Sequence, residues 1–242
     1  MEPFFFGKDR EILGNYHRAE GIPKACGLLI AGPLLNEGIR AHRALLQVSR
    51  RCAALGYDVL RFDYAGLGNS PGATRDFSFD DWSQDIVDAA TELTAVSGSE
   101  VKAVLAVRFA ANLVADLTQS LPLDRLLLWD PILTGRQWLN RLHIADECLP
   151  VGRRANNDSN GYEYMGHVLG SDFEYSLLSR QQPQLRAASV FAVISSAYLW
   201  NEELDTLTND IEIMNSDCGW ESPTSDLIYP SDIIGALCRR MT

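Results

Sequence analysis

Residues 57–72, YDVLRFDYAGLGNSPG, decide the fold, together with the segment FDDWSQDIVDA that follows at 79–89. The mostly apolar first half indicates a buried strand over 57–64. Glycines at 66, 68 and 72 indicate a turn with backbone conformations that favour glycine. Apolar residues at helical spacing then predict a helix over 79–95. This order of strand, turn and helix is typical of one unit of an α/β sheet.

The same order recurs along most of the chain. Apolar runs predict further strands at 26–31, 101–107, 125–129, 189–195 and 210–214, and helical spacing predicts further helices at 40–55, 110–118 and 232–240. Short continuous apolar strands that alternate with helices indicate a mostly parallel, doubly wound sheet with helices on both faces.

The pattern breaks after the strand at 125–129. Nearly sixty residues separate it from the next strand, and their middle is polar (RRANNDSNGYEYMGH, 153–167) between two helical pieces. Connections of this length are uncommon and often form lids. We expect a single domain over 1–242 with a helical and irregular cap inserted at 134–186, and an ordinary surface excursion is the alternative.

Composition excludes several functional classes. The chain has 242 residues, with 21 Lys and Arg against 32 Asp and Glu, and a formal net charge of −11, which disfavours nucleic acid or an anionic membrane as the main partner. No apolar stretch approaches the roughly 20 residues of a membrane span. Five scattered cysteines without a CxxC pair indicate reduced thiols and no structural zinc. We expect a cytoplasmic protein without metal or cofactor.

The stretches at 57–72 and 79–89 resemble the loop and helix after the fourth strand in α/β-hydrolases of the serine-aminopeptidase and acylesterase type. Their D-x-x-G-x-G-x-S-x-G pattern is matched here by Asp63, Gly66, Gly68, Ser70 and Gly72. AGPLLNEGIRAHR (31–43) is similar to the loop that contributes to the oxyanion hole. LLLWDPILTGRQWLNRL (126–142) resembles the sixth strand and cap entry of the hydrolase-like family associated with the exosortase A system. The resemblance covers roughly 26–240 and implies the α/β-hydrolase fold.

The resemblance places an arginine where the nucleophile is expected. These hydrolases carry the nucleophile on a G-x-S-x-G elbow after the fifth strand. Here the elbow reads AVRFA at 106–110, with Arg108 at its centre. A guanidinium stays protonated and cannot act as a nucleophile. Alanine in place of both glycines predicts a less tightly strained turn.

The implied acid and base positions also lack the expected residue types. An acid is expected just after the strand at 189–195, where the chain reads Ser-Ala-Tyr at 196–198 and the nearest carboxylates are Glu202 and Glu203. A histidine is expected after 210–214, where 215–220 reads NSDCGW, and the last histidine of the chain is His167. We therefore expect serine-triad hydrolysis to be lost.

Arg108 has two interpretations. It follows a parallel strand and precedes a helix, where open α/β sheets bind ligands and backbone N–H groups attract anions. It would then hold a small acyl or anionic ligand. The other residues expected around that ligand are Leu34, Leu35, Asn36 and Phe109. Alternatively, Arg108 pairs with Glu37 or Asp130, because a buried charge needs a partner.

Several other side chains carry groups that could take part in catalysis. The candidates for acid and base catalysis are Glu37, Asp130, His143 and His167. His42 is expected on a solvated helix face and Ser70 in turn formation. Cys218, with no His or Lys beside it in sequence, is expected to be an inert small hydrophobe.

Three functions stay open. A non-hydrolytic accessory or ligand-binding protein for a small acyl or anionic molecule in a biosynthetic pathway predicts a buried, paired Arg108 and outward-pointing histidines. An enzyme with rearranged acid/base chemistry (lyase, cyclase or acyltransferase) predicts that a carboxylate and a cap histidine converge on the crevice. A conventional esterase or thioesterase needs a serine elbow. A second copy of the chain or a pathway protein is left open as a partner, and the resemblance implies an exosortase-associated role.

Overall fold

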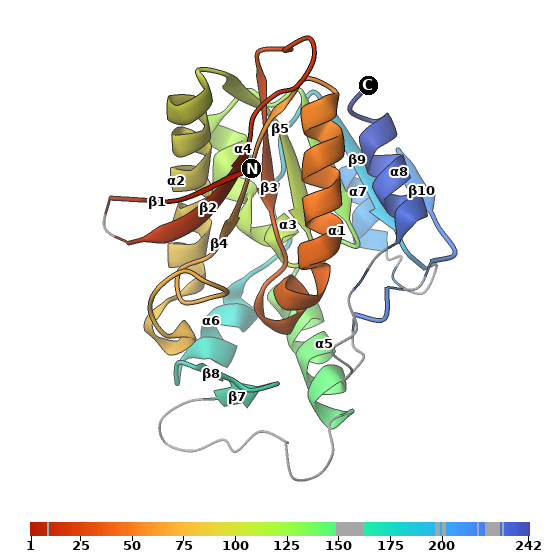
Figure 1. The fold of residues 1–242 in the computed structure, drawn as a ribbon. Helices are drawn as coiled ribbons and strands as arrows, with labels where there is room; N and C mark the ends of the chain where they lie inside the picture. The colour runs from red at the N-terminus through yellow and green to blue at the C-terminus, as the bar shows by residue number, and fades with distance from the viewer. Residues whose placement is uncertain are drawn as a thin grey trace.

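The computed structural model describes residues 1–8, 10–148, 162–196, 199, 202–216, 218–220, 228 and 230–242. A central eight-stranded sheet runs through them in the order β1-β2-β4-β3-β5-β6-β9-β10 (Figure 1). From β4 through β10 the neighbouring strands are parallel, whereas β1 and β2 are antiparallel to their neighbours. The strands are β1 (Glu2–Phe6), β2 (Ile12–His17), β3 (Cys26–Ala31), β4 (Asp58–Asp63), β5 (Glu100–Val107), β6 (Arg125–Trp129), β9 (Ser189–Ile194) and β10 (Ile211–Ile213).

Helices cover both faces of this sheet, which confirms the predicted doubly wound α/β architecture. One face carries α1 (Leu35–Ala54) and α8 (Ser231–Arg239), which pack against each other. The other face carries α2 (Phe79–Ser97), α3 (Ala110–Leu113) and α4 (Ala115–Ser120) (Figure 1). The single helix predicted over 110–118 is two short helices that meet at Val114. A 3₁₀ turn, η1 (Thr74–Asp76), follows β4, and a short helix, α7 (Glu202–Leu207), lies between β9 and β10 in the chain.

The N-terminal hairpin of β1 and β2 was not predicted. Strand β2 reads ILGNYH, in which polar Asn15 and His17 are buried beside apolar residues, so it presents neither a continuous apolar run nor clean alternation. Its side chains are buried because β2 lies between β1 and β4. The two strands extend the sheet on the β4 side.

The glycine-patterned loop after β4 is held in place by α2. Trp82 Nε1 donates to the Ala65 carbonyl at 3.1 Å, and the Ala65 N–H donates to Asp85 Oδ2 at 2.9 Å. Gly66 and Gly72 have φ of +71° and +103°, and a Cβ on either would come within 2.7 Å of the Phe77 ring. The motif that marks the fold therefore has a structural function in this chain.

The helices and strands between β6 and β9, called the β6–β9 insertion below, lie at the carboxyl end of the parallel strands, at the bottom of Figure 1. They are α5 (Gly135–Glu147), β7 (Tyr162–Tyr164), β8 (His167–Leu169) and α6 (Phe173–Ser179). Met165 and Gly166, with φ of +50° and +85°, form the two-residue turn between β7 and β8. Positions 149–161, with most of the polar middle of the expected cap, lie outside the described residues.

Among the residues that the structure describes, no helix has the length and apolar character needed to cross a membrane.

Candidate functional site

The elbow after β5 is fully formed around Arg108. Its φ is +57°, in the left-handed region, where a non-glycine residue costs about 1 kcal/mol or more. The Arg108 N–H donates to the Trp129 carbonyl at 3.0 Å, and its carbonyl accepts from Ile132 and Ala111, each at 3.1 Å. These bonds to the β6 side and to α3 hold the strained backbone. The prediction of a relaxed turn was wrong, because the buried alanines at 106 and 110 are small enough for this turn.

The charge of Arg108 is neutralised by Glu37. The Arg108 side chain is 1% exposed, and its Nε and Nη2 each donate to Glu37 Oε1 at 2.9 Å. Glu37 stands in the first turn of α1, where the helix N-terminus also favours a negative charge. The structure thus forms one of the two ion pairs that the sequence predicted. An anionic ligand at Arg108 would have to compete with this carboxylate.

An indole ring and a second carboxylate complete the surroundings of the elbow. The guanidinium carbon of Arg108 lies 5.0 Å from the centroid of the Trp220 ring, in cation–π range. Trp220 Nε1 donates to Asp130 Oδ2 at 2.7 Å, and Asp130 Oδ1 accepts from the Ser195 N–H at 2.6 Å. Burial raises the pKa of Asp130, against the opposing effect of these N–H bonds and of the nearby Arg108 charge.

Asp130, Trp220 and Arg108 form one chain of contacts. A carboxylate accepts a ring N–H, and that ring lies against the side chain on the elbow, as Asp, His and Ser do in serine hydrolases. The indole nitrogen is a donor only, so Trp220 cannot take a proton as histidine does. Sequence reasoning named Asp130 but missed Trp220, because it looked for a histidine. The tryptophan that ends NSDCGW was the available signal.

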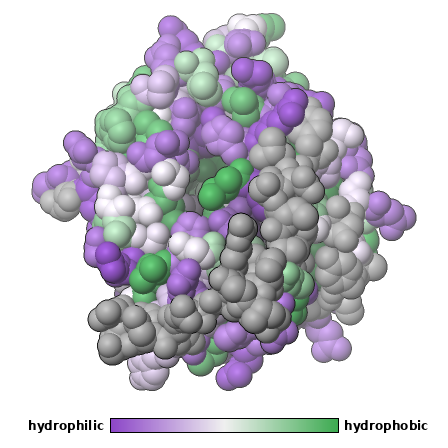
Figure 2. All heavy atoms as spheres, turned by 60° about the horizontal axis from the view of Figure 1, so that its bottom comes forward, coloured by the Kyte–Doolittle hydropathy of each residue, from purple (hydrophilic) through white to green (hydrophobic). Residues whose placement is uncertain are grey.

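Little space is left among the described residues between the first turn of α1, helix α5 and the β7–β8 turn. The described residues enclose about 20 Å³ there, room for roughly one water molecule. Leu34 is fully buried, and Leu35 is 6% exposed with φ of +53°. Phe109 is fully buried and stacks on Trp138 of α5, with centroids 4.6 Å apart. Figure 2 brings this end forward and shows a mostly hydrophilic surface with one hollow near its centre.

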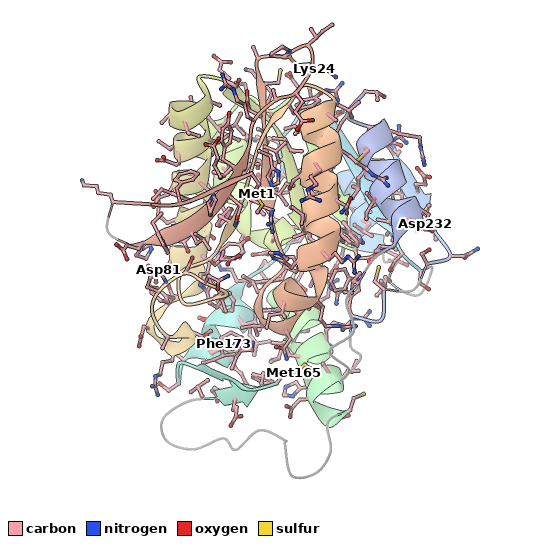
Figure 3. All side chains as sticks on the ribbon, viewed as in Figure 1. Met1, Lys24, Asp81, Met165, Phe173 and Asp232 are labelled. Atoms are coloured by element: carbon pink, nitrogen blue, oxygen red, sulfur yellow. The ribbon has the colours of Figure 1, made fainter. Side chains whose placement is uncertain are left out.

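Asn36 connects the first turn of α1 to the β7–β8 hairpin. Its Nδ2 donates to the Met165 carbonyl at 3.1 Å, and its Oδ1 lies 3.1 Å from His167 Nε2, which therefore carries the hydrogen. Figure 3 shows Met165 at the lower end of the molecule, beneath α1. Burial lowers the pKa of His167, which favours the neutral ring. A histidine of the insertion thus reaches the residue next to Glu37.

The other candidates lie outside this arrangement. His143 is exposed on α5, with its ring 5.4 Å from that of Tyr164. Ser70 donates to the Asp63 carbonyl and accepts from the Leu13 N–H at 2.9 Å, so it ties the loop to β2. Cys218 is 8% exposed, and burial raises the pKa of its thiol to about 12, which makes it unreactive.

The positions implied for the acid and the base are described in part. Positions 197 and 198, beside the expected acid, and position 217, beside the expected base, lie outside the described residues. Glu202 and Glu203 stand in α7, where Glu203 accepts a hydrogen bond from Gln137 of α5.

Comparison with known proteins identifies the fold. No family model and no curated protein matches the chain. It is similar to Est1E from Butyrivibrio proteoclasticus with bound ferulic acid, at a TM-score of 0.64 and 14% identity over 98% of this chain and 96% of that one. It is also similar to mouse alpha/beta hydrolase domain-containing protein 10 (0.62, 13%, 100% and 97%) and to proline iminopeptidase from Mycobacterium smegmatis (0.58, 13%, 99% and 97%). With this strand order, the likeness shows that the chain has the α/β-hydrolase fold.

Proposed function

We propose that this chain is an α/β-hydrolase-fold protein without serine-triad hydrolysis, in which the elbow has become a structural ion pair. It would serve as an accessory or ligand-binding protein for a small acyl or anionic molecule in a biosynthetic pathway. The observation that carries the proposal is Arg108, which occupies the strained elbow, is 1% exposed and is paired with Glu37.

Two chemical facts support the loss of hydrolysis. Arginine has no lone pair to attack a carbonyl carbon, and an indole has no basic nitrogen to accept the proton of a nucleophile. Arg108 and Trp220 take the places next to each other that a nucleophile and its base would need. With arginine and tryptophan at these positions, the chain would lack both the nucleophile and the base that serine-triad hydrolysis needs.

The cellular setting is a further part of the proposal. The resemblance of the LWDP segment at 128–131 to the exosortase-associated hydrolase-like family supports an accessory role in biosynthesis and a cytoplasmic location. The solved structures of similar fold include Est1E with bound ferulic acid and a proline iminopeptidase, so hydrolysis is the activity to test first.

The test is incubation with short-chain nitrophenyl esters and, separately, with a fluorophosphonate probe read by intact-protein mass. We expect no nitrophenol above the rate of a heat-denatured sample and no added mass. Ser70→Ala is the matched control, because Ser70 belongs to the motif loop and not to the elbow. Ester turnover or labelling that persists in Ser70→Ala would overturn the proposal.

One contact favours the alternative function, an enzyme with rearranged acid/base chemistry. His167 of β8 reaches Asn36, and Asn36 is adjacent in the chain to Glu37, so a histidine and a carboxylate both lie at the first turn of α1. Such an enzyme would turn over a substrate without fluorophosphonate labelling. Turnover of an ester that is lost in His167→Asn but unchanged in His143→Asn would establish it in place of the binding function.

A further inference from the structure

A mostly apolar cavity lined by described residues lies away from the elbow, on the α1 side of the sheet. Its volume is about 370 Å³, within the range of small-molecule pockets, whereas the pocket beside Glu37 and Trp220 holds about 20 Å³. Residues of the β3–α1 turn, of α1, of β4 and of the glycine-patterned loop form its walls. Apolar side chains dominate those walls: Ile30, Leu35, Ile39, Leu45, Phe62 and Leu67.

A buried arginine without a carboxylate partner lines this cavity. Arg61 of β4 is 6% exposed, and no ion pair joins it to any acidic residue within the described part of the chain. Its Nη1 contacts His42 Nδ1 at 3.2 Å, its Nη2 lies 3.7 Å from the Met1 sulfur, and its buried Nε has no hydrogen-bond partner. A buried cation so poorly paired is costly, which points to a missing anionic partner.

The carboxylate whose charge acts on Arg61 is Asp63, but the hydrogen bonds of that carboxylate go elsewhere. Asp63 also lines the cavity, but its Oδ2 accepts from the backbone N–H of Asn69 at 2.9 Å and from the Asn69 side chain at 3.4 Å. That oxygen also faces Gly68, where a Cβ would come within 2.5 Å of it. Asp63 thus shapes the loop, and it does not form an ion pair with Arg61.

His42 and Arg43 add donors to the cavity. His42 is exposed on α1, as the sequence predicted, and partial desolvation first and then the charge of Arg61 lower its pKa, which favours the neutral ring at pH 7. Nδ1 of that neutral ring accepts from Arg61, which leaves Nε2 as an N–H donor. Arg43 lines the same cavity. Apolar walls with a few grouped polar donors are the usual composition of a small-molecule site.

We propose that this cavity binds an amphiphilic anion, with a carboxylate or phosphate head on Arg61 and an acyl chain along the apolar walls. The forked N–H groups of arginine fit both head groups. The inference deepens the proposed function, on which it rests for the class of ligand, and moves the ligand from the elbow to the α1 side of the sheet.

The test is isothermal titration calorimetry of the full chain with decanoate, decyl phosphate and, as the uncharged control, decanol. Arg61→Met removes the charge and keeps an apolar stem, and His143→Asn on α5 is the matched control outside the cavity. Leu45→Phe narrows the cavity without touching the charge. Thermal unfolding of each variant shows whether it is folded before it is titrated.

We expect wild type and His143→Asn to bind a decyl anion at least tenfold more tightly than decanol. Arg61→Met should lose at least tenfold in anion affinity, and Leu45→Phe should weaken both anion and decanol. Stronger binding of decanoate or of decyl phosphate identifies the head group. No binding of either anion, or equal binding by Arg61→Met, overturns the inference. Neither result depends on fluorophosphonate labelling, so failure here is separable from failure of the proposed function.

Discussion

Two buried arginines in this molecule have opposite surroundings. Arg108, on the elbow, is 1% exposed and has Glu37 as a partner, and the pocket beside Glu37 holds about 20 Å³. Arg61, on β4, is 6% exposed, contacts a histidine and a methionine sulfur and faces about 370 Å³. A buried cation that is fully paired belongs to the structure, and one that lacks an anion is available to a ligand. The two arginines therefore differ in pairing, and the proposed ligand site is at Arg61.

Breaking the Arg108 pair should produce the largest effect. Glu37→Ala leaves a guanidinium buried without its carboxylate, so we expect the free energy of unfolding to fall by about 3 kcal/mol in urea denaturation. The double variant Glu37→Leu with Arg108→Met removes both charges and should recover most of that loss. A loss below about 1 kcal/mol in Glu37→Ala would show that the pair contributes little.

Lowering the pH should reduce the free energy of unfolding through His17, whose pKa is affected by the charge of Arg61. Burial first, and then the charge of Arg61, lower the pKa of His17 from 6.5 to about 4. Between these two values the unfolded chain binds a proton that the folded chain does not, so stability is lost as pH falls through this window. We expect His17 to account for about 2 kcal/mol of the loss between pH 7 and pH 4.

Urea denaturation of the wild type and of His17→Gln at pH 7 and at pH 4 measures the contribution of His17 to this loss of stability. The pKa values of His42 and His167 are lowered too, so some acid sensitivity should survive in His17→Gln. If the free energy of unfolding of His17→Gln depends on pH as that of the wild type does, His17 is not neutral and buried in the folded chain.

Removing Arg61 should have a smaller effect of opposite sign to the loss of Glu37. Arg61→Met replaces a poorly paired buried cation with an apolar side chain, so we expect the unliganded protein to gain about 1 kcal/mol. Thermal and urea unfolding without added ligand test this. A loss of 2 kcal/mol or more would mean that Arg61 is a structural residue like Arg108, and the contrast between the two would disappear.

Much of the fold could be predicted from the sequence, because its parallel strands are continuous apolar runs. The strand at 125–129 has the predicted bounds, and the helix predicted over 79–95 extends to Ser97. The β1–β2 hairpin was missed because polar side chains are buried in β2.

The candidate site was predicted less completely, because its contacts join distant parts of the chain. Glu37 could be named from its place after the predicted strand at 26–31. Trp220 could not, since it meets Asp130 across 90 positions and no local spacing records that contact. In the sequence Arg61 is one polar position in a mostly apolar strand. That no ion pair joins it to a described carboxylate appears only in three dimensions.

The most direct test compares the decanoate affinities of variants at the two arginines by isothermal titration calorimetry. The double variant Glu37→Leu with Arg108→Met should bind the decyl anion with the affinity of the wild type, whereas Arg61→Met should bind at least tenfold more weakly. The reverse result, with binding lost in the elbow variant and kept in Arg61→Met, would return the ligand to the elbow and contradict the account.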